Sequence, residues 1–138
     1  MCGEWSQADT DCATYLNNVG VGSRWSGTMN LNNPSLSVLT PSCPAKTAAC
    51  SCDMANADPS TYPDQYRQWL LMNAEGSMTA FETGWGWFYW TWRTESSPQW
   101  SWKLGMAAGI VPQKTYERSY NCSTNSKDWA AAGLAETY

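Results

Sequence analysis

The chain contains no histidine and few charged residues, and both shortages exclude classes of function. Without histidine, a Ser-His-Asp triad and a His-based zinc site are both excluded. Only 8 of the 138 residues are Lys or Arg and the net charge is −4. Nucleic-acid binding is therefore not expected, since phosphate contacts need a basic patch, and an anionic membrane surface is disfavoured for the same reason. No apolar run reaches the roughly 18 residues that span a bilayer.

Phenylalanine is also scarce, whereas the other aromatic residues are abundant. The chain has 2 Phe but 10 Trp and 7 Tyr, so nearly every aromatic side chain has a polar edge. Such side chains favour surfaces that are half wet and half apolar. In the stretch GWGWFYWTWRTE, five aromatic residues occupy the six positions from Trp87 to Trp92. An aromatic run is ordinarily part of a core. This run is therefore open to two interpretations, as a packed interior and as a platform for a ligand.

The cysteine content indicates an oxidised, secreted protein, placed outside the cell or in the cell wall. The triplet NCS, beginning at Asn121, fits the N-glycosylation pattern and points to the same compartment. The CSC pattern is also compatible with metal thiolates, but it lacks a matching second pair, so we prefer disulfides and expect no metal. The sequence does not choose among the pairings of the six candidates, which are Cys2, Cys12, Cys43, Cys50, Cys52 and Cys122.

The opening residues, MCGEWSQ, contain neither the charged segment nor the apolar core of a signal peptide. A chain that looks secreted but has no signal peptide suggests that the beginning of the protein is missing. A misplaced gene start at Met1 would have the same appearance.

Hydrophobic periodicity predicts three helices and one strand. Residues 6–22 predict a short helix on the stripe of Ala8, Cys12, Tyr15, Leu16 and Val19. Residues 58–84 predict the clearest helix, residues 85–91 a strand buried on both faces, and residues 98–109 a last short helix. Residues 23–60 form a long Cys-rich loop. No linker divides the chain, so residues 1–138 are interpreted as one region.

With the strand end at Glu4, this order is a βαβα pattern, which is typical of an α/β protein. Two strand ends, GEW at Gly3–Trp5 and WTWRTE at Trp90–Glu95, then open on the face where active sites of parallel α/β proteins lie. A carboxylate beside a wall of indoles suits a sugar, and glycoside hydrolysis needs neither metal nor His. From the residues alone, a lone Glu such as Glu4 is ordinarily a solvated surface residue, and a Trp-rich binding module is favoured over sugar chemistry.

Two long stretches resemble a known family. CGEWSQADTDCATYLNNVGVGSRWSGT (Cys2–Thr28) and GWGWFYWTWRTESSPQWSWKLGMAAGIVP (Gly84–Pro112) look like the carboxyl-terminal part of fungal exo-β-1,3-glucanases of glycoside hydrolase family 5. The Cys-rich insertion is similar to that of basidiomycete members. The resemblance covers essentially the whole chain.

This resemblance implies the C-terminal portion of a (β/α)8 TIM barrel, namely the end of strand 7, helix 7, strand 8 and helix 8, with the long Cys-rich loop. It implies retaining hydrolysis of β-1,3-glucan to glucose without a cofactor. The Glu of the family's GEW motif is the nucleophile, which is Glu4 here. The Trp at the end of strand 8 forms the floor of the −1 sugar subsite, which falls on Trp90, with Trp92 as the alternative. The further substrate-binding candidates in matching motifs are Trp5, Glu95 and Arg24.

The chain also departs from the family pattern. The family's acid/base Glu follows an Asn at the end of strand 4, and nothing here corresponds to strands 1 to 6. We therefore expect a chain that carries the nucleophile but is weakly active or inactive alone, with the missing N-terminal barrel portion as its partner and β-glucan as the ligand. The rival interpretation is a non-catalytic secreted protein that binds β-glucan or another partner through its Trp and Tyr surface.

Overall fold

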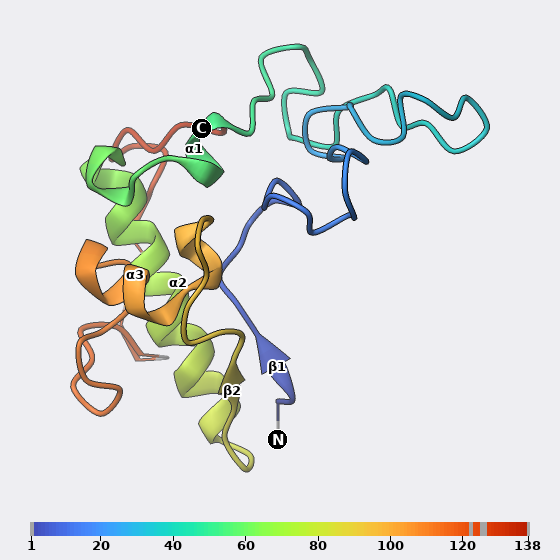
Figure 1. Cartoon of the computed structure of the whole chain (residues 1–138). Helices are drawn as coiled ribbons and strands as arrows, with labels where there is room; N and C mark the ends of the chain where they lie inside the picture. Colours follow the sequence, from blue (N-terminus) through green and yellow to red (C-terminus); the bar gives the residue numbers. More distant parts are fainter. Residues whose placement is uncertain (1, 122, 125–126, 138) are drawn as a thin grey trace. The chain divides into compact units, whose positions relative to one another are not determined.

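The computed structural model describes residues 2–121, 123–124 and 127–137 of the chain (Figure 1). The chain forms two compact units. The first comprises Met1–Gln7 and Asp58–Leu134, and the second comprises Ala8–Ala57 and Ala135–Tyr138.

The first unit holds nearly all of the regular structure (Figure 1). Its α-helices are α2 (Asp64–Glu82) and α3 (Trp102–Ala108), and its strands are β1 (Glu4–Trp5) and β2 (Phe88–Tyr89). Two 3-10 turns, η1 (Pro59–Thr61) and η2 (Pro98–Trp100), precede the two helices.

Strands β1 and β2 form a parallel pair in which Glu4 lies opposite Phe88 and Trp5 opposite Tyr89. Main-chain hydrogen bonds extend the pairing beyond both strands, from Cys2 N–H to the Gly86 carbonyl at 2.9 Å and from Trp90 N–H to the Trp5 carbonyl at 2.8 Å. Parallel strands need a crossover, and α2 lies on that crossover.

The predicted strand over residues 85–91 is shorter in the structure, where β2 covers Phe88–Tyr89, and the prediction that it is buried on both faces is wrong. Phe88 is 62% exposed and Trp90 is 53% exposed, whereas Trp87 and Tyr89 pack inward. The aromatic run therefore alternates between a packed face and an open face, as side chains on a strand do.

Helix α2 forms where the periodicity predicts it. Pro63 precedes its first turn, and the buried residues Tyr66, Leu70, Ala74 and Met78 recur at helical spacing along one face. The core of the first unit gathers on this face, where Ala74 and Met78 meet Trp102 and Val111.

The last predicted helix is also confirmed, as η2 followed by α3. Ser101 caps α3, because its hydroxyl accepts the Leu104 N–H at 3.2 Å. Gly109, at φ +71°, ends the helix in the left-handed conformation.

In its described residues, the second unit contains one short helix, α1 (Asp53–Asn56), among turns (Figure 1). The predicted helix over residues 6–22 is wrong. Tyr15 and Asn18 adopt positive φ angles of +68° and +82°, which an α-helix does not allow. The apolar stripe on which the prediction rested is largely exposed here, since Tyr15, Leu16 and Val19 all lie in solvent.

Polar contacts replace the helix. The Asp11 carboxylate accepts hydrogen bonds from the backbone N–H groups of Arg24 at 2.8 Å and Trp25 at 2.9 Å. The Asn17 side-chain amide donates to the same carboxylate at 2.9 Å. These contacts hold the segment in turns, because they satisfy backbone N–H groups far along the chain that a helix over residues 6–22 would not reach.

Disulfides join Cys12 to Cys52 and Cys43 to Cys50, which confirms the disulfide prediction for these four residues. Cys2 has no disulfide partner in the part of the chain that the structure describes, and Cys122 lies outside it. Among the described residues, no group of three or more Cys, Asp or Glu is arranged to hold a metal ion. No helix in the described ranges has the length and hydropathy that a bilayer-spanning segment requires.

Candidate functional site

Glu4 and Trp90 lie on the same face of the parallel strand pair. Residues that pair directly across a sheet project to the same side, and residues two apart along a strand do so as well. Glu4 is paired with Phe88, and Trp90 follows Phe88 by two residues while its N–H continues the pairing with β1. All three side chains are exposed, with 53% of Trp90 accessible. The structure thus brings the predicted nucleophile and the predicted sugar platform to one open surface.

Trp5 lies on the opposite, packed face. Its ring makes edge contacts with Tyr89 at 5.0 Å and with Trp87 and Phe81, each at 5.7 Å between centroids. This aromatic layer rests on the core residues of α2 and α3. Trp5 therefore fixes β1 to the body of the unit, and its side chain does not share the face of Glu4.

The Tyr89 hydroxyl joins the two strands just beyond Glu4. It accepts a hydrogen bond from the Gln7 backbone N–H and donates to the Gln99 carbonyl. Burial raises the pKa of Tyr89 well above its ordinary value, and the bond from Gln7 opposes that shift only in part. The hydroxyl therefore stays protonated and keeps its role as a donor.

Gln7 and Gln99 extend this network on either side. The Gln7 side-chain amide donates to the Ile110 carbonyl at 2.9 Å, and the Gln99 amide donates to the Tyr66 hydroxyl at 2.6 Å. Both glutamines are 2% exposed, so the network is buried. It holds the end of β1 against β2 and the helices in one register.

Main-chain hydrogen bonds also place the segment after β2. Thr91 N–H donates to the Trp100 carbonyl at 2.6 Å, and the Thr91 and Trp92 carbonyls accept from Trp102 at 2.8 Å and Lys103 at 3.0 Å. The peptide bond between Trp90 and Thr91 is cis. Because these bonds fasten the backbone to η2 and α3, the exposed indoles of Trp90 and Trp92 project from a fixed segment.

The other predicted site residues lie elsewhere. Glu95 is exposed in the bend between β2 and η2. Arg24 belongs to the second unit, where its guanidinium lies 3.5 Å from the Asp11 carboxylate. Asn121, the predicted glycosylation site, is exposed in the segment after α3.

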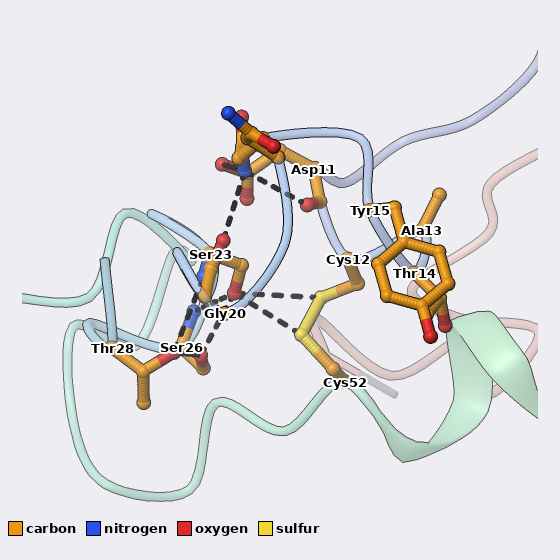
Figure 2. Close-up of a pocket in the computed structure, with 13 residues that line it drawn as sticks. Asp11, Cys12, Ala13, Thr14, Tyr15, Gly20, Ser23, Ser26, Thr28 and Cys52 are labelled. Carbon is orange, nitrogen blue, oxygen red and sulfur yellow. Dashed lines mark hydrogen bonds between the residues drawn. A yellow bond between two sulfur atoms is a disulfide. The ribbon is translucent and has the colours of Figure 1, made fainter. Parts of the chain in front are cut away.

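One feature of the second unit was not predicted from the sequence. A hollow of about 320 Å³ opens beside the Cys12–Cys52 disulfide (Figure 2). Tyr15 and the Ser and Thr hydroxyls of residues 23–28 line it. The run NNVGVG, rich in Asn and Gly, was the signal for turns at this place, and the apparent helical stripe concealed it.

A second hollow, of about 390 Å³, lies in the first unit between the exposed side of α2 and the segment after α3. Gly76 and Ala80 line one side of it, and Tyr120 and Thr124 line the other.

Comparison with known proteins finds similar fungal sequences, and no protein-family model matches the chain. The chain is 53% identical over its whole length to "Probable glucan 1,3-beta-glucosidase D" of Aspergillus terreus. It is 52% identical over its whole length to the protein of the same name from Aspergillus clavatus. It is also 52% identical, over 88% of its length, to "Glucan 1,3-beta-glucosidase D" of Emericella nidulans.

The chain spans about a sixth of these curated relatives, with 16% of the first two proteins and 14% of the third covered. Fungal proteins named as glucan 1,3-β-glucosidases thus match the chain from end to end. To that extent, they support the resemblance to fungal exo-β-1,3-glucanases. The activity named for the relatives belongs to proteins several times longer than this chain.

Proposed function

We propose that this chain is the C-terminal part of a fungal glucan 1,3-β-glucosidase, in which Glu4 is the nucleophile that attacks β-1,3-glucan. The observation that carries the proposal is the position of Glu4 and Trp90 on one open face of the parallel pair, whose other face is covered by helices. Roughly 50% identity to proteins named for this activity supports it.

The exposed aromatic side chains support the fold proposed for the whole protein. In a (β/α)8 barrel, one face of each strand points to the barrel interior and the other is covered by helices. Trp5, Tyr89 and the core of α2 and α3 would then form the outer layer, and Glu4, Phe88 and Trp90 would face the interior. A barrel needs about 250 residues, so the remaining strands would come from a segment outside this chain.

The chemistry follows the retaining mechanism. The Glu4 carboxylate attacks the anomeric carbon, a glycosyl ester forms, and water later releases β-glucose. The Trp90 indole supports the C–H face of the sugar ring while the ring flattens. A second carboxyl group about 5–5.5 Å away must protonate the leaving sugar, and it would lie in the outside segment. Without that acid, the 138 residues alone would lose about 10²- to 10⁴-fold in rate.

The other predicted residues have supporting roles in this proposal. Trp92, exposed like Trp90, extends the aromatic platform. Trp5 holds β1 in place from the packed face. Glu95 and Arg24 stay predictions as further contacts to substrate. The two disulfides are compatible with the secreted location that we propose for the enzyme.

A covalent trap tests the nucleophile directly. The longer protein, meaning the glucosidase of which this chain is proposed to be the C-terminal part, would be treated with 2-deoxy-2-fluoro-β-glucosyl fluoride. The nucleophile displaces fluoride from this reagent and forms a slowly hydrolysed glucosyl ester. We expect peptide mass spectrometry to find the fluoroglucosyl group on Glu4. The Glu4→Gln variant should take up no label and should lose at least about 10⁴-fold in glucose release from soluble β-1,3-glucan.

Glu117→Gln is the matched control, because Glu117 is an exposed carboxylate that pairs with Lys114 in the segment after α3. It should label and hydrolyse as the unchanged protein does. Label on another carboxylate, or full activity in Glu4→Gln, would show that Glu4 is not the nucleophile.

The alternative function is β-glucan binding without hydrolysis. One observation favours it: the exposed indoles of Trp85, Trp90 and Trp92 all belong to this chain. Quenching of Trp fluorescence by soluble β-1,3-glucan, with no glucose released by either the chain or the longer protein, would support this alternative against the hydrolase.

A further inference from the structure

We propose that the hollow beside the Cys12–Cys52 disulfide is a second saccharide-binding site, in which Tyr15 stacks against a glucosyl unit of β-glucan. The inference rests on the proposed function for the identity of the sugar. It uses none of the residues of β1 and β2, because every residue that lines the hollow belongs to the second unit.

The aromatic ring of Tyr15 contributes little to the stability of the fold. The side chain is 70% exposed, so its ring contributes little to a core. Its backbone has a φ of +68°, a conformation that is unusual for a bulky residue. Strained positions of this kind persist where the surrounding structure imposes them, and they cluster at ligand sites.

The surroundings of Tyr15 do impose this conformation. The Cys12–Cys52 disulfide fixes the chain three residues before it. Two residues after it, the Asn17 side-chain amide donates to the Asp11 carboxylate at 2.9 Å and to the Gly22 carbonyl at 3.1 Å. Turns with hydrogen bonds from Leu16 to Ala13 and from Asn18 to Tyr15 complete the loop. The backbone that carries the ring is therefore fixed at the hollow.

One part of the lining is polar, with its hydroxyl groups bonded to one another. The Ser23 hydroxyl lies 2.8 Å from that of Ser26 and 3.2 Å from Cys52 Sγ, and the Ser26 hydroxyl lies 2.8 Å from that of Thr28 (Figure 2). Ser23 is 3% exposed and its hydroxyl belongs to this internal network, so a ligand would meet the hydroxyls of Ser26 and Thr28 instead.

Other polar groups around the hollow remain open to a ligand. Within the described ranges, the Tyr15 and Thr14 hydroxyls make no hydrogen bond. The amides of Asn17 and Asn18 each use one end only, which leaves the Asn17 oxygen and the Asn18 nitrogen available. The site thus combines an aromatic face with donors and acceptors of moderate strength, which suits a sugar ring with its C–H face and its hydroxyl groups.

The charge of the lining favours a neutral ligand. Asp11 is its one charged residue. Burial raises the pKa of Asp11, but the hydrogen bonds from Arg24, Trp25 and Asn17 outweigh it and the net pKa is lowered. The carboxylate is therefore ionised, and its charge is balanced by these donors and by the Arg24 guanidinium at 3.5 Å. No Lys or Arg lines the hollow to hold a phosphate.

The size of the hollow fits a small part of a glucan chain. Its volume of about 320 Å³ lies at the lower end of the range of about 300–1,000 Å³ that is usual for small-molecule sites. A glucan longer than a few sugars would continue outside a hollow of this volume. A single aromatic platform gives weak binding, and such sites serve to hold a polymer near a second site on the same protein.

The test measures binding and hydrolysis separately. The chain, produced with its disulfides intact, would be titrated with a short β-1,3-gluco-oligosaccharide and followed by NMR at the residues of the hollow. We expect shifts in the signals of Thr14, Tyr15 and Asn18. Tyr15→Ala should weaken the affinity measured at these signals by about tenfold, the loss of one aromatic contact. Tyr15→Phe, which keeps the ring, should retain most of it.

Two further variants separate binding from folding. Tyr15→Gly relieves the positive φ, so it should unfold at the same temperature as the unchanged chain or higher, and still lose affinity. Tyr116→Ala removes a tyrosine of similar exposure, 78%, from the first unit and should leave the affinity unchanged. Equal affinity in Tyr15→Ala and Tyr116→Ala, or shifts confined to residues of β1 and β2, would overturn the inference.

Hydrolysis of an aryl β-glucoside by the longer protein distinguishes this inference from the proposed function. That substrate has one sugar and needs only the face that carries Glu4 and Trp90. Tyr15→Ala should therefore leave the rate of its hydrolysis unchanged and slow only the attack on insoluble β-1,3-glucan. If the longer protein hydrolyses no aryl glucoside, the proposed function fails. If Tyr15→Ala slows both substrates equally, the second binding site fails.

Discussion

The guanidinium group of Arg118 lies 2.6 Å from the carboxylate of Glu82, and this ion pair ties the segment after α3 to the last turn of α2. The same carboxylate accepts the Trp87 indole N–H at 3.0 Å. Glu82 thus connects the last segment of the first unit with the aromatic layer behind the Glu4 face. The hydrogen bond from Arg118 is the main cause that lowers the pKa of Glu82. Burial opposes it, and the bond from Trp87 adds to it.

The first prediction concerns acid stability. Because the folded-state pKa of Glu82 lies below its ordinary value of 4.5, Glu82 stabilises the fold above that value, and this contribution is lost as the pH falls toward the folded-state pKa. We expect Glu82→Gln to be less stable than the unchanged chain at pH 7 and to lose less stability on acidification. Urea midpoints at pH 7 and at a pH below 4.5 measure the difference. Glu117→Gln, which alters an exposed pair, should follow the unchanged chain at both.

The second prediction compares the two disulfides. A disulfide stabilises mainly by restricting the unfolded chain, and more so for a longer loop. The Cys12–Cys52 bond closes a separation of 40 residues, whereas Cys43–Cys50 closes one of 7. Replacing both cysteines of the first bond by Ala should cost about 4 kcal/mol, and of the second about 2 kcal/mol. Denaturant unfolding followed in the second unit would give both values. Equal losses would contradict the loop-length argument.

Helices α2 and α3 and the position of the strand at Phe88–Tyr89 could be predicted from the sequence, because their signals are local and agree with one another. Along α2, the buried stripe, Pro63 at the start and the burial of Met78 near the end all follow a helical period. The inward-facing Tyr89 and outward-facing Phe88 could not be told apart, since a run of aromatic residues hides the alternation of a strand. Only pairing with β1 determines which face is packed.

The loop around Tyr15 could not be predicted, because nonlocal contacts decide it. The apolar spacing of Ala8, Cys12 and Tyr15 satisfies a helical template, but the Asp11 carboxylate bonds to Arg24 and Trp25, 13 and 14 residues away. At the Glu4 site, the GEW motif and its resemblance made the residue a candidate, and the register opposite Phe88 had to come from the structure. The role of Tyr89 as the link between the two strands gave no sequence signal.

The third prediction concerns two glycines within helices. At Gly76 an added Cβ would meet nothing within 4 Å, whereas at Gly105 it would lie 3.1 Å from a Val111 methyl group. Gly76→Ala should stabilise the first unit by about 0.5–1 kcal/mol, because glycine is a poor helix former. Gly105→Ala has the same helical gain, but the contact with buried Val111 should cancel or reverse it. Thermal unfolding of both variants measures the contrast, and equal shifts would show that helix propensity alone decides.

The last prediction concerns the Tyr89 hydroxyl, which holds β1 and β2 in register beneath the Glu4 face. Tyr89→Phe keeps the ring that packs on Trp5 at 5.0 Å and on Trp102 at 5.1 Å. It leaves the Gln7 N–H and the Gln99 carbonyl, both in residues that are 2% exposed, without their partner. Unpaired buried groups of this kind cost about 1–3 kcal/mol, so the first unit should lose stability in that range.

The loss should be concentrated at the end of the strand pair, because Gln7 is the residue that the hydroxyl fastens. The hydrogen bond from the Trp90 N–H to the Trp5 carbonyl lies next to it, so the Trp90 amide should exchange with solvent faster in Tyr89→Phe. The exchange rate of the Leu70 amide in α2 should change only as far as the global stability changes. Tyr116→Phe, at an exposed position, should change stability by no more than about 0.5 kcal/mol. If Tyr89→Phe changes stability and Trp90 exchange no more than Tyr116→Phe does, the register beneath Glu4 depends on ring packing and not on the hydroxyl.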